Sequence, residues 1–206
     1  KWETARNLLK RRTLIPLFLQ GFFGVFPWNV ISFWFFNYLE TERGYSSDDV
    51  LATMATAVLI LAAGYFVGGS LGDWLFRRTR RGRLIVCLFG VITGAIMLYA
   101  TLQVPLANKG QFMLLLSITA FLIPFSSPNI ISTVYDITVP EVRSTALSVQ
   151  YFIESGGAAL SPLMAGWIAE RALLGTAILL ICTVAWVIAA LFLLVDDRHL
   201  VDAAEI

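Results

Sequence analysis

The stretch Gly68-Gly69-Ser70-Leu71-Gly72-Asp73-Trp74-Leu75-Phe76-Arg77-Arg78-Thr79-Arg80-Arg81-Gly82-Arg83 joins two long apolar runs. Its glycines allow a neighbouring backbone to approach closely, as at the packed faces of membrane helices. Its five arginines cannot cross a bilayer, and basic loops stay on the cytoplasmic side. The stretch therefore predicts two membrane-spanning helices joined by a cytoplasmic loop.

Composition extends this prediction to the whole chain. Its 206 residues are 58% hydrophobic and 14% charged, whereas soluble domains have about 45–50% apolar and about 25% charged residues. A membrane helix needs about 20 mostly apolar residues. Six such runs are predicted, which makes the fold class an all-α membrane protein: 14–38, 50–72, 84–105, 111–134, 144–168 and 174–195.

Basic residues are concentrated in segments that the predicted spans place on one side of the membrane. Five lie in the first 12 residues and five in the arginine loop, whereas the predicted external loop 39–49 is mainly acidic. The positive-inside rule then places both termini in the cytoplasm. Residues 1–13 are predicted to form a basic amphipathic segment on the membrane surface, residues 14–195 the membrane domain, and 196–206 a cytoplasmic tail. The chain starts without methionine and is interpreted as the second half of a longer protein.

Two stretches resemble the major facilitator superfamily of transporters. Its signature between paired helices reads roughly Gly-x-Leu-Ala/Gly-Asp-Arg-x-Gly-Arg-Arg, and Trp74 and Phe76 depart from it. The Pro140-Glu141-Val142-Arg143 turn, with Ala146 after it, resembles a second element of this superfamily. The residues that match the signature are Gly69, Leu71, Gly72, Asp73, Arg77 and Arg78.

The resemblance implies two inverted three-helix repeats, alternating access and a charge cluster that latches the cytoplasmic side. Asp73 is expected to accept from Arg77, Arg78 or Arg143, and Asp136 to join the cluster or to line the cytoplasmic mouth. Arginines that only anchor the loop inside are the alternative. The gate residues so assigned are Gly69, Gly72, Asp73, Arg77, Arg78, Glu141 and Arg143.

Prolines and asparagines interrupt the first and fourth runs at corresponding places. Phe26-Pro27-Trp28-Asn29 lies in the first run, and Pro124-Phe125-Ser126-Ser127-Pro128-Asn129 in the fourth. Proline removes a backbone hydrogen bond, and paired helix breaks point to a site near the midplane. The alternative is a pair of packing kinks. Glycines at spacing four, Gly64, Gly68 and Gly72 as well as Gly90 and Gly94, are interpreted as packing seams.

Glu154 is the one acidic residue well inside a run. Ten residues at 1.5 Å each place it about 15 Å deep, where it must be protonated, paired or facing water. A proton or substrate-cation site is one interpretation, and a protonated acid held for packing is the other. Gln150 and Ser161 share its helix face. The predicted cavity residues are Glu154, Gln150, Trp28, Asn29, Asn129 and Ser126.

The inventory of reactive residues does not suggest an enzyme. The one histidine, His199, lies in the charged tail, and Cys87 and Cys182 lie in apolar runs. The glycine pair is followed by Asp and Arg rather than Gly-Lys-Ser/Thr, so it is no nucleotide loop. Neither metal, cofactor nor nucleic acid is expected.

The function predicted from the sequence is one half of a secondary active transporter. Gln20-Gly21-Phe22-Phe23-Gly24-Val25-Phe26-Pro27-Trp28 and Tyr45-Ser46-Ser47 resemble the prokaryotic spinster-like branch. That resemblance implies a prokaryotic inner or plasma membrane and a small organic or lipid-like solute. The expected partners are the bilayer, this solute, and another six-helix half or a second copy. A half-size homodimeric carrier and a non-transporting six-span scaffold are the alternatives.

Overall fold

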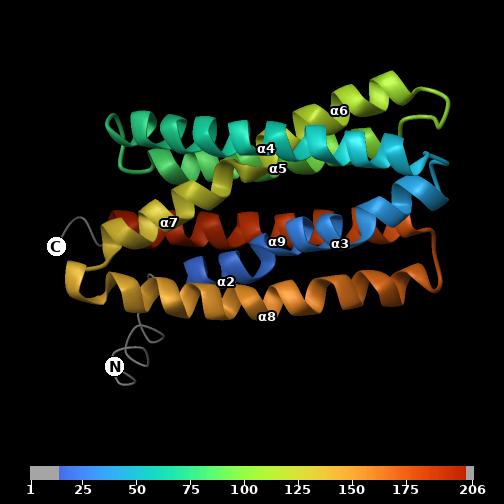
Figure 1. The fold of residues 1–206 in the computed structure, drawn as a ribbon. Helices are drawn as coiled ribbons and strands as arrows, with labels where there is room; N and C mark the ends of the chain where they lie inside the picture. The colour runs from blue at the N-terminus through green and yellow to red at the C-terminus, as the bar shows by residue number, and fades with distance from the viewer. Residues whose placement is uncertain (1–13, 203–206) are drawn as a thin grey trace.

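The computed structural model describes residues 14–202, and describes side chains for residues 14–194. The predicted amphipathic segment 1–13 lies outside the described residues, as does the end of the predicted tail. No strand occurs between residues 14 and 202. The helices, shown in Figure 1, are α2 (Leu14–Gly24), α3 (Phe26–Thr41), α4 (Ser47–Phe76), α5 (Gly82–Leu102), α6 (Lys109–Leu122), η1 (Ile123–Phe125), α7 (Ser126–Ile137), η2 (Pro140–Val142), α8 (Arg143–Ala169) and α9 (Leu174–Asp202).

Five of the six predicted spans are confirmed as helical stretches long and apolar enough to cross a membrane within the described part of the chain. Two of them are broken helices, α2 with α3 and α6 with η1 and α7. The remaining predicted span is the fifth along the chain, α8, which has 27 residues and runs alongside the others (Figure 1). It is not among the five because its small and polar residues, among them Gln150 and Glu154, make it less apolar.

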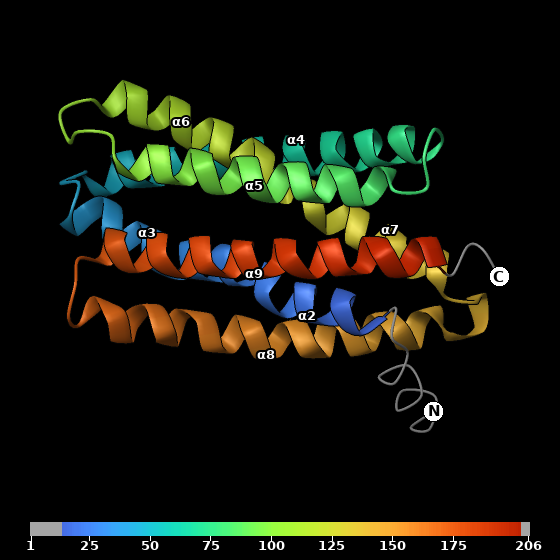
Figure 2. The ribbon, with the colours of Figure 1, turned by 180° about the vertical axis from the view of Figure 1, so that it is seen from behind.

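The packing of the helices has an inverted internal symmetry. The first span, α2 with α3, packs mainly on α8 and α9, whereas the fourth span packs mainly on α4 and α5. The third and sixth spans, which are α5 and α9, pack on each other on the face seen in Figure 2. Exchanging each helix with the one three spans later leaves this contact pattern unchanged. The arrangement supports the predicted pair of three-helix repeats.

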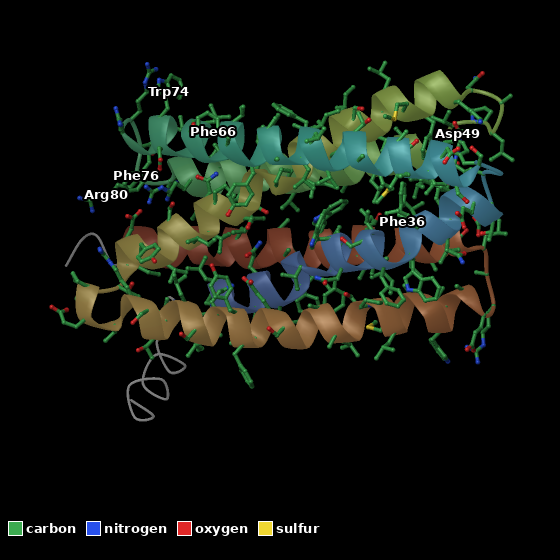
Figure 3. All side chains as sticks on the ribbon, in the orientation of Figure 1. Phe36, Asp49, Phe66, Trp74, Phe76 and Arg80 are labelled. Carbon is green, nitrogen blue, oxygen red and sulfur yellow. The ribbon has the colours of Figure 1, made fainter. Side chains whose placement is uncertain are left out.

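Charged residues separate to the two ends of the bundle. Figure 3 shows Trp74, Phe76 and Arg80 at one end and Asp49 at the other. We call the first the basic end and the second the outer end. At the outer end, Ser46 caps α4 by accepting the amide hydrogen of Asp49 at 3.2 Å. Side-chain caps of this kind satisfy backbone donors that no turn of the helix can reach.

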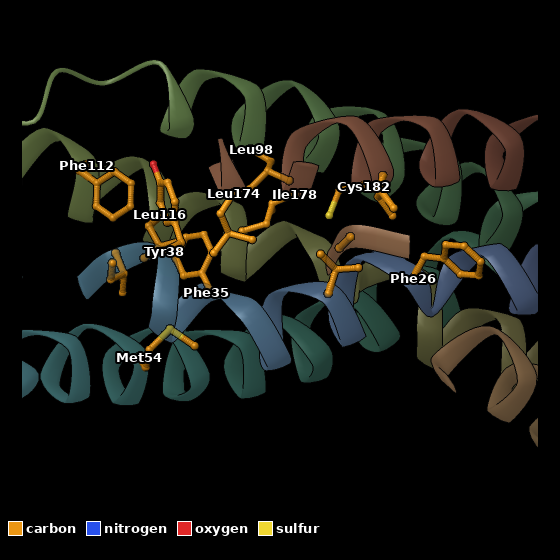
Figure 4. Close-up of a cluster of buried hydrophobic side chains, with 14 of the residues drawn as sticks. Phe26, Phe35, Tyr38, Met54, Leu98, Phe112, Leu116, Leu174, Ile178 and Cys182 are labelled. Atoms are coloured by element: carbon orange, nitrogen blue, oxygen red, sulfur yellow. The ribbon is translucent and has the colours of Figure 1, made fainter. Parts of the chain in front are cut away.

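Two apolar clusters hold the bundle together. The larger occupies the outer half, where Phe35 from α3 stacks on Phe112 from α6 near Ile178 of α9 (Figure 4). The smaller lies toward the basic end around Leu17, Val134 and other buried residues. Lipid is as apolar as these side chains, so close packing rather than escape from water stabilises such contacts in a membrane.

Candidate functional site

The first helix break lies at Val25, just before the predicted Pro-Trp-Asn segment. α2 ends at Gly24, Val25 follows it as the N-cap of α3, and Pro27 stands in the first turn of α3, where a missing amide hydrogen costs least. Asn29 helps to close the break, because both its backbone N–H and its Nδ2 donate to the carbonyl of Val25, at 3.1 and 2.8 Å. The break is therefore satisfied locally rather than left open.

The second break, η1, is enclosed between two glycine faces. A Cβ on Gly68 of α4 would lie 2.7 Å from the Cα of Phe125, and one on Gly90 of α5 would lie 2.6 Å from the Cβ of Phe125. Real Cβ atoms do not approach other atoms so closely, so these positions accept only glycine without movement. The predicted packing seams are confirmed at Gly64, Gly68, Gly72 and Gly90, whereas a Cβ on Gly94 would meet Ile123 at an ordinary 3.6 Å.

A cavity of about 250 Å³ opens between the two breaks. It is lined from the first span, from α4, from η1 with α7 and from α8, and we call it the central cavity. Three of the predicted cavity residues line it, namely Trp28, Ser126 and Glu154. Sequence reasoning missed Gln20, Tyr65 and Tyr151, which also line it. An amide inside an apolar run, as at Gln20, was the available signal for the first of these.

Gln150 and Glu154 form a hydrogen-bonded pair on α8. The side-chain amide of Gln150 donates from Nε2 to Oε1 of Glu154 at 2.7 Å. Gln150 is only 1% exposed, and its Oε1 has no hydrogen-bond partner. A Cβ on Gly21 of α2 would lie 2.9 Å from Oε1 of Glu154 and still closer to the Gln150 amide. The absence of a side chain at Gly21 thus makes room for the pair beside the first helix break.

The structure does not bring the two predicted asparagines into the central cavity. Asn29 lines a different cavity of about 660 Å³ between α3 and α8 in the outer half. Asn129 is 1% exposed, and its Nδ2 donates to the carbonyls of Gly68 at 2.9 Å and Phe125 at 2.8 Å. Its role here is to tie α7 to α4 and to satisfy a carbonyl at the break, because a buried carbonyl needs a donor.

At the basic end, Arg83 joins three helices. Its guanidinium donates to Asp73 at the end of α4, at 2.9 Å, and to Asp136 at the end of α7. It also lies over the ring of Phe76, 4.3 Å from the centroid. The expectation that Asp73 pairs with Arg77, Arg78 or Arg143 is wrong, because the start of α5 brings Arg83 closer. We call Asp73, Arg83 and Asp136 the basic-end latch.

The other predicted gate residues lie around this latch. Arg77 is exposed, and Arg78 lies over the ring of Trp74, 4.1 Å from the centroid. The Nε of Arg143 donates to the carbonyl of Tyr135 at 3.0 Å, and within residues 14–194 no ion pair joins Arg143 to the exposed Glu141. The two predicted gate glycines differ. A Cβ on Gly72 would overlap Asn129, whereas one on Gly69 would meet Pro128 at an ordinary 3.4 Å.

A second charged contact closes the outer end, and sequence reasoning missed it. The carboxylate of Glu42, at the end of α3, accepts the backbone N–H groups of Leu174 and of Gly175, the latter at 3.1 Å. These two residues begin α9, where the helix dipole favours a negative charge. Next to it, the buried Arg43 donates to the carbonyl of Val104 at 3.1 Å. At both ends of the bundle, charged side chains therefore link one helix to another.

No group of three or more His, Cys, Asp or Glu side chains in the described part could hold a metal ion. The family whose sequence model matches the chain is described as Major Facilitator Superfamily, and the match covers residues 1–162.

Proposed function

The chain belongs to the Major Facilitator Superfamily, and from this premise we propose that it is a membrane transporter of the secondary active class that carries a small organic or lipid-like solute through the central cavity. In such carriers the substrate and ion sites lie near the midplane, where broken helices meet, and access alternates between the two sides. Glu154 couples transport to an ion gradient, with a proton as the simplest ion. The spinster-like resemblance supports the lipid-like end of this substrate range.

The observation that carries the proposal is the position of Glu154. It lies 11 residues after the start of α8, a 27-residue helix, so at 1.5 Å per residue it is about 16 Å from the basic end and near the centre of the bilayer. It lines the cavity between the two helix breaks. An ionisable residue at this depth is costly and is a functional candidate by default.

The residues on the face that carries the cavity support the proposal that a second helix bundle packs there. On this face of α3, α4, α7 and α8 the cavity exposes Ser127 and Tyr151 beside Glu154, and polar groups of this kind face protein or cavity water rather than lipid. The same helices expose Phe33, Phe66 and Phe152. We propose that another six-helix half, or a second copy of this chain, covers this face.

Transport and coupling are tested together with the intact transporter in liposomes. The liposomes receive a mixed library of anionic, neutral and cationic amphiphiles under an imposed proton gradient, and mass spectrometry measures uptake. We expect gradient-dependent accumulation of at least one library member. Glu154→Gln abolishes accumulation above equilibrium, whereas Glu170→Gln, which removes an exposed carboxylate outside the central cavity, leaves it intact.

The outcomes separate the alternatives. If no library member enters, the transport proposal is wrong and a scaffold role gains support. If a solute accumulates equally well in the Glu154→Gln variant, the chain transports but Glu154 does not couple it to the gradient.

A further inference from the structure

The lining of the central cavity carries one sign of charge. Among the described residues that line it, Glu154 is the only carboxylic acid, and neither lysine, arginine nor histidine is present. The salt bridges of the described part lie at the ends of the bundle, as with Arg83 at the basic end and Lys109 at the outer end. An anionic solute would therefore find no cationic side chain among these residues.

The carboxyl group of Glu154 is held in place by a neutral partner and forms no ion pair with another described residue. Its partner on α8 is the amide of Gln150, which is neutral and donates one N–H to Oε1. A buried carboxylate in a medium of low polarity is stable only if a proton or a positive group compensates its charge. A positive group could reach it from the cavity, which Glu154 lines, whereas Gln150 and Gly21 of α2 lie on another side of it.

Three aromatic rings line the same cavity, and they come from three different helices. Trp28 belongs to α3, Tyr65 to α4 and Tyr151 to α8. Tyr151 precedes Glu154 by three residues, so the two lie on the same face of α8. Aromatic faces attract cations, and tryptophan does so best. Rings around a single carboxylate are the arrangement that recognises an organic ammonium group.

We propose that the central cavity binds an amphiphile with a single positive charge. Its ammonium group lies against Glu154 and among the rings of Trp28, Tyr65 and Tyr151, and its apolar part lies against Leu61 and other aliphatic residues of the lining. This inference rests on the proposed function, because it takes the central cavity as the solute site. It adds the charge and the chemical class of that solute.

The test is a binding measurement with two probes of the same ring and opposite charge. Radiolabelled benzyltrimethylammonium is bound to the purified, intact transporter in detergent, and unlabelled benzylsulfonate serves as the anionic competitor. We expect saturable binding of the cation that the anion does not displace. Glu154→Gln weakens it about 30-fold or more, as expected when one partner of a buried charge pair is removed. Glu170→Gln, outside the cavity, leaves it unchanged.

The aromatic contribution is tested separately, which keeps the proposal open to refutation if Glu154→Gln folds poorly. Trp28→Leu should weaken binding of the cation about tenfold, whereas Tyr151→Phe, which retains a ring, should change it less than about threefold. Trp167→Leu, an exposed tryptophan outside the central cavity, is the matched control.

The proposal is overturned if the cation does not bind, if benzylsulfonate competes equally, or if folded Glu154→Gln and Trp28→Leu bind the cation as tightly as the unmodified protein. Uptake of neutral or anionic library members together with any of these results would leave the proposed transport function standing and refute only the charge of the solute. Absence of uptake for the whole library would refute the transport function itself.

Discussion

Gly68→Ala tests whether the glycine seam holds the broken fourth span in place. The added Cβ would lie 2.7 Å from the Cα of Phe125 and 2.8 Å from its ring, against an ordinary contact of 3.4–4 Å. The η1 segment cannot retreat easily, because Gly90 packs on its other side, where a Cβ would lie 2.6 Å from the Cβ of Phe125. Overpacking of a well-packed site costs about 1–3 kcal/mol. We therefore expect a loss of stability of this size.

The assay is the midpoint of thermal unfolding in detergent. For a chain of this length about 1 kcal/mol corresponds to about 2–4 °C, so Gly68→Ala should lower the midpoint by about 2–12 °C. Its neighbour supplies the control, because a Cβ on Gly69 would meet only Pro128, at 3.4 Å. Gly69→Ala should leave the midpoint unchanged or raise it, since alanine favours a helix over glycine by up to about 1 kcal/mol. Equal midpoints for the two variants would refute the reasoning.

Two further predictions concern the ends of the bundle. Arg83→Gln should lower the free energy of unfolding by about 1–2 kcal/mol, because it removes two partly exposed ion pairs and a cation–π contact. The control Arg80→Gln, at an exposed loop residue, should change it by less than about 0.5 kcal/mol. Chemical denaturation in detergent measures both, and equal losses would argue against the latch. Glu42→Gln should cost about 0.5–1 kcal/mol by removing a negative charge from the start of α9. The control is Glu170→Gln, an exposed carboxylate that follows α8 as Glu42 follows α3. The loss in Glu42→Gln should shrink in high salt, and a loss that salt does not change would contradict the electrostatic explanation.

The sequence was sufficient to predict what depends on local composition. Apolar length predicted the spans, and proline with asparagine predicted breaks in the first and fourth of them, within a few residues of Val25 and η1. The exception is α8, which forms the expected helix, of 27 residues, but whose polar residues leave it less apolar than the other five spans. Length and periodicity are properties of one segment, so they can be read without knowing the neighbours.

Pairing between segments could not be predicted in the same way. Asp73 lies close in sequence to Arg77 and Arg78, but its carboxylate binds Arg83, because the turn after α4 directs the start of α5 back toward it. Asn129 was assigned to the cavity from its place next to prolines, yet α4 packs close enough at Gly68 to take its amide as a donor.

The small residues of the two repeats show how the site departs from the symmetry of the fold. On α4, Gly64, Gly68 and Gly72 face the fourth span, and a Cβ on Gly64 would collide with the carbonyl of Phe121. On α8 the residues at the same spacing are Gly157, Ser161 and Ala165; all three are buried, and a Cβ on Gly157 would collide with the carbonyl of Phe22 in the first span. The second helix of each repeat thus receives the first helix of the other repeat in a groove of small residues.

This correspondence pairs Leu61 with Glu154, since each precedes the first glycine of its groove by three residues. Both side chains line the central cavity. Packing needs only a small-residue groove on each helix, and both repeats supply one, so symmetry accounts for the frame of the cavity. It does not account for a carboxylate on one wall opposite a leucine on the other. The proposed binding and coupling roles therefore depend on a carboxyl group that the packing symmetry does not require, at the depth where a charge is most costly.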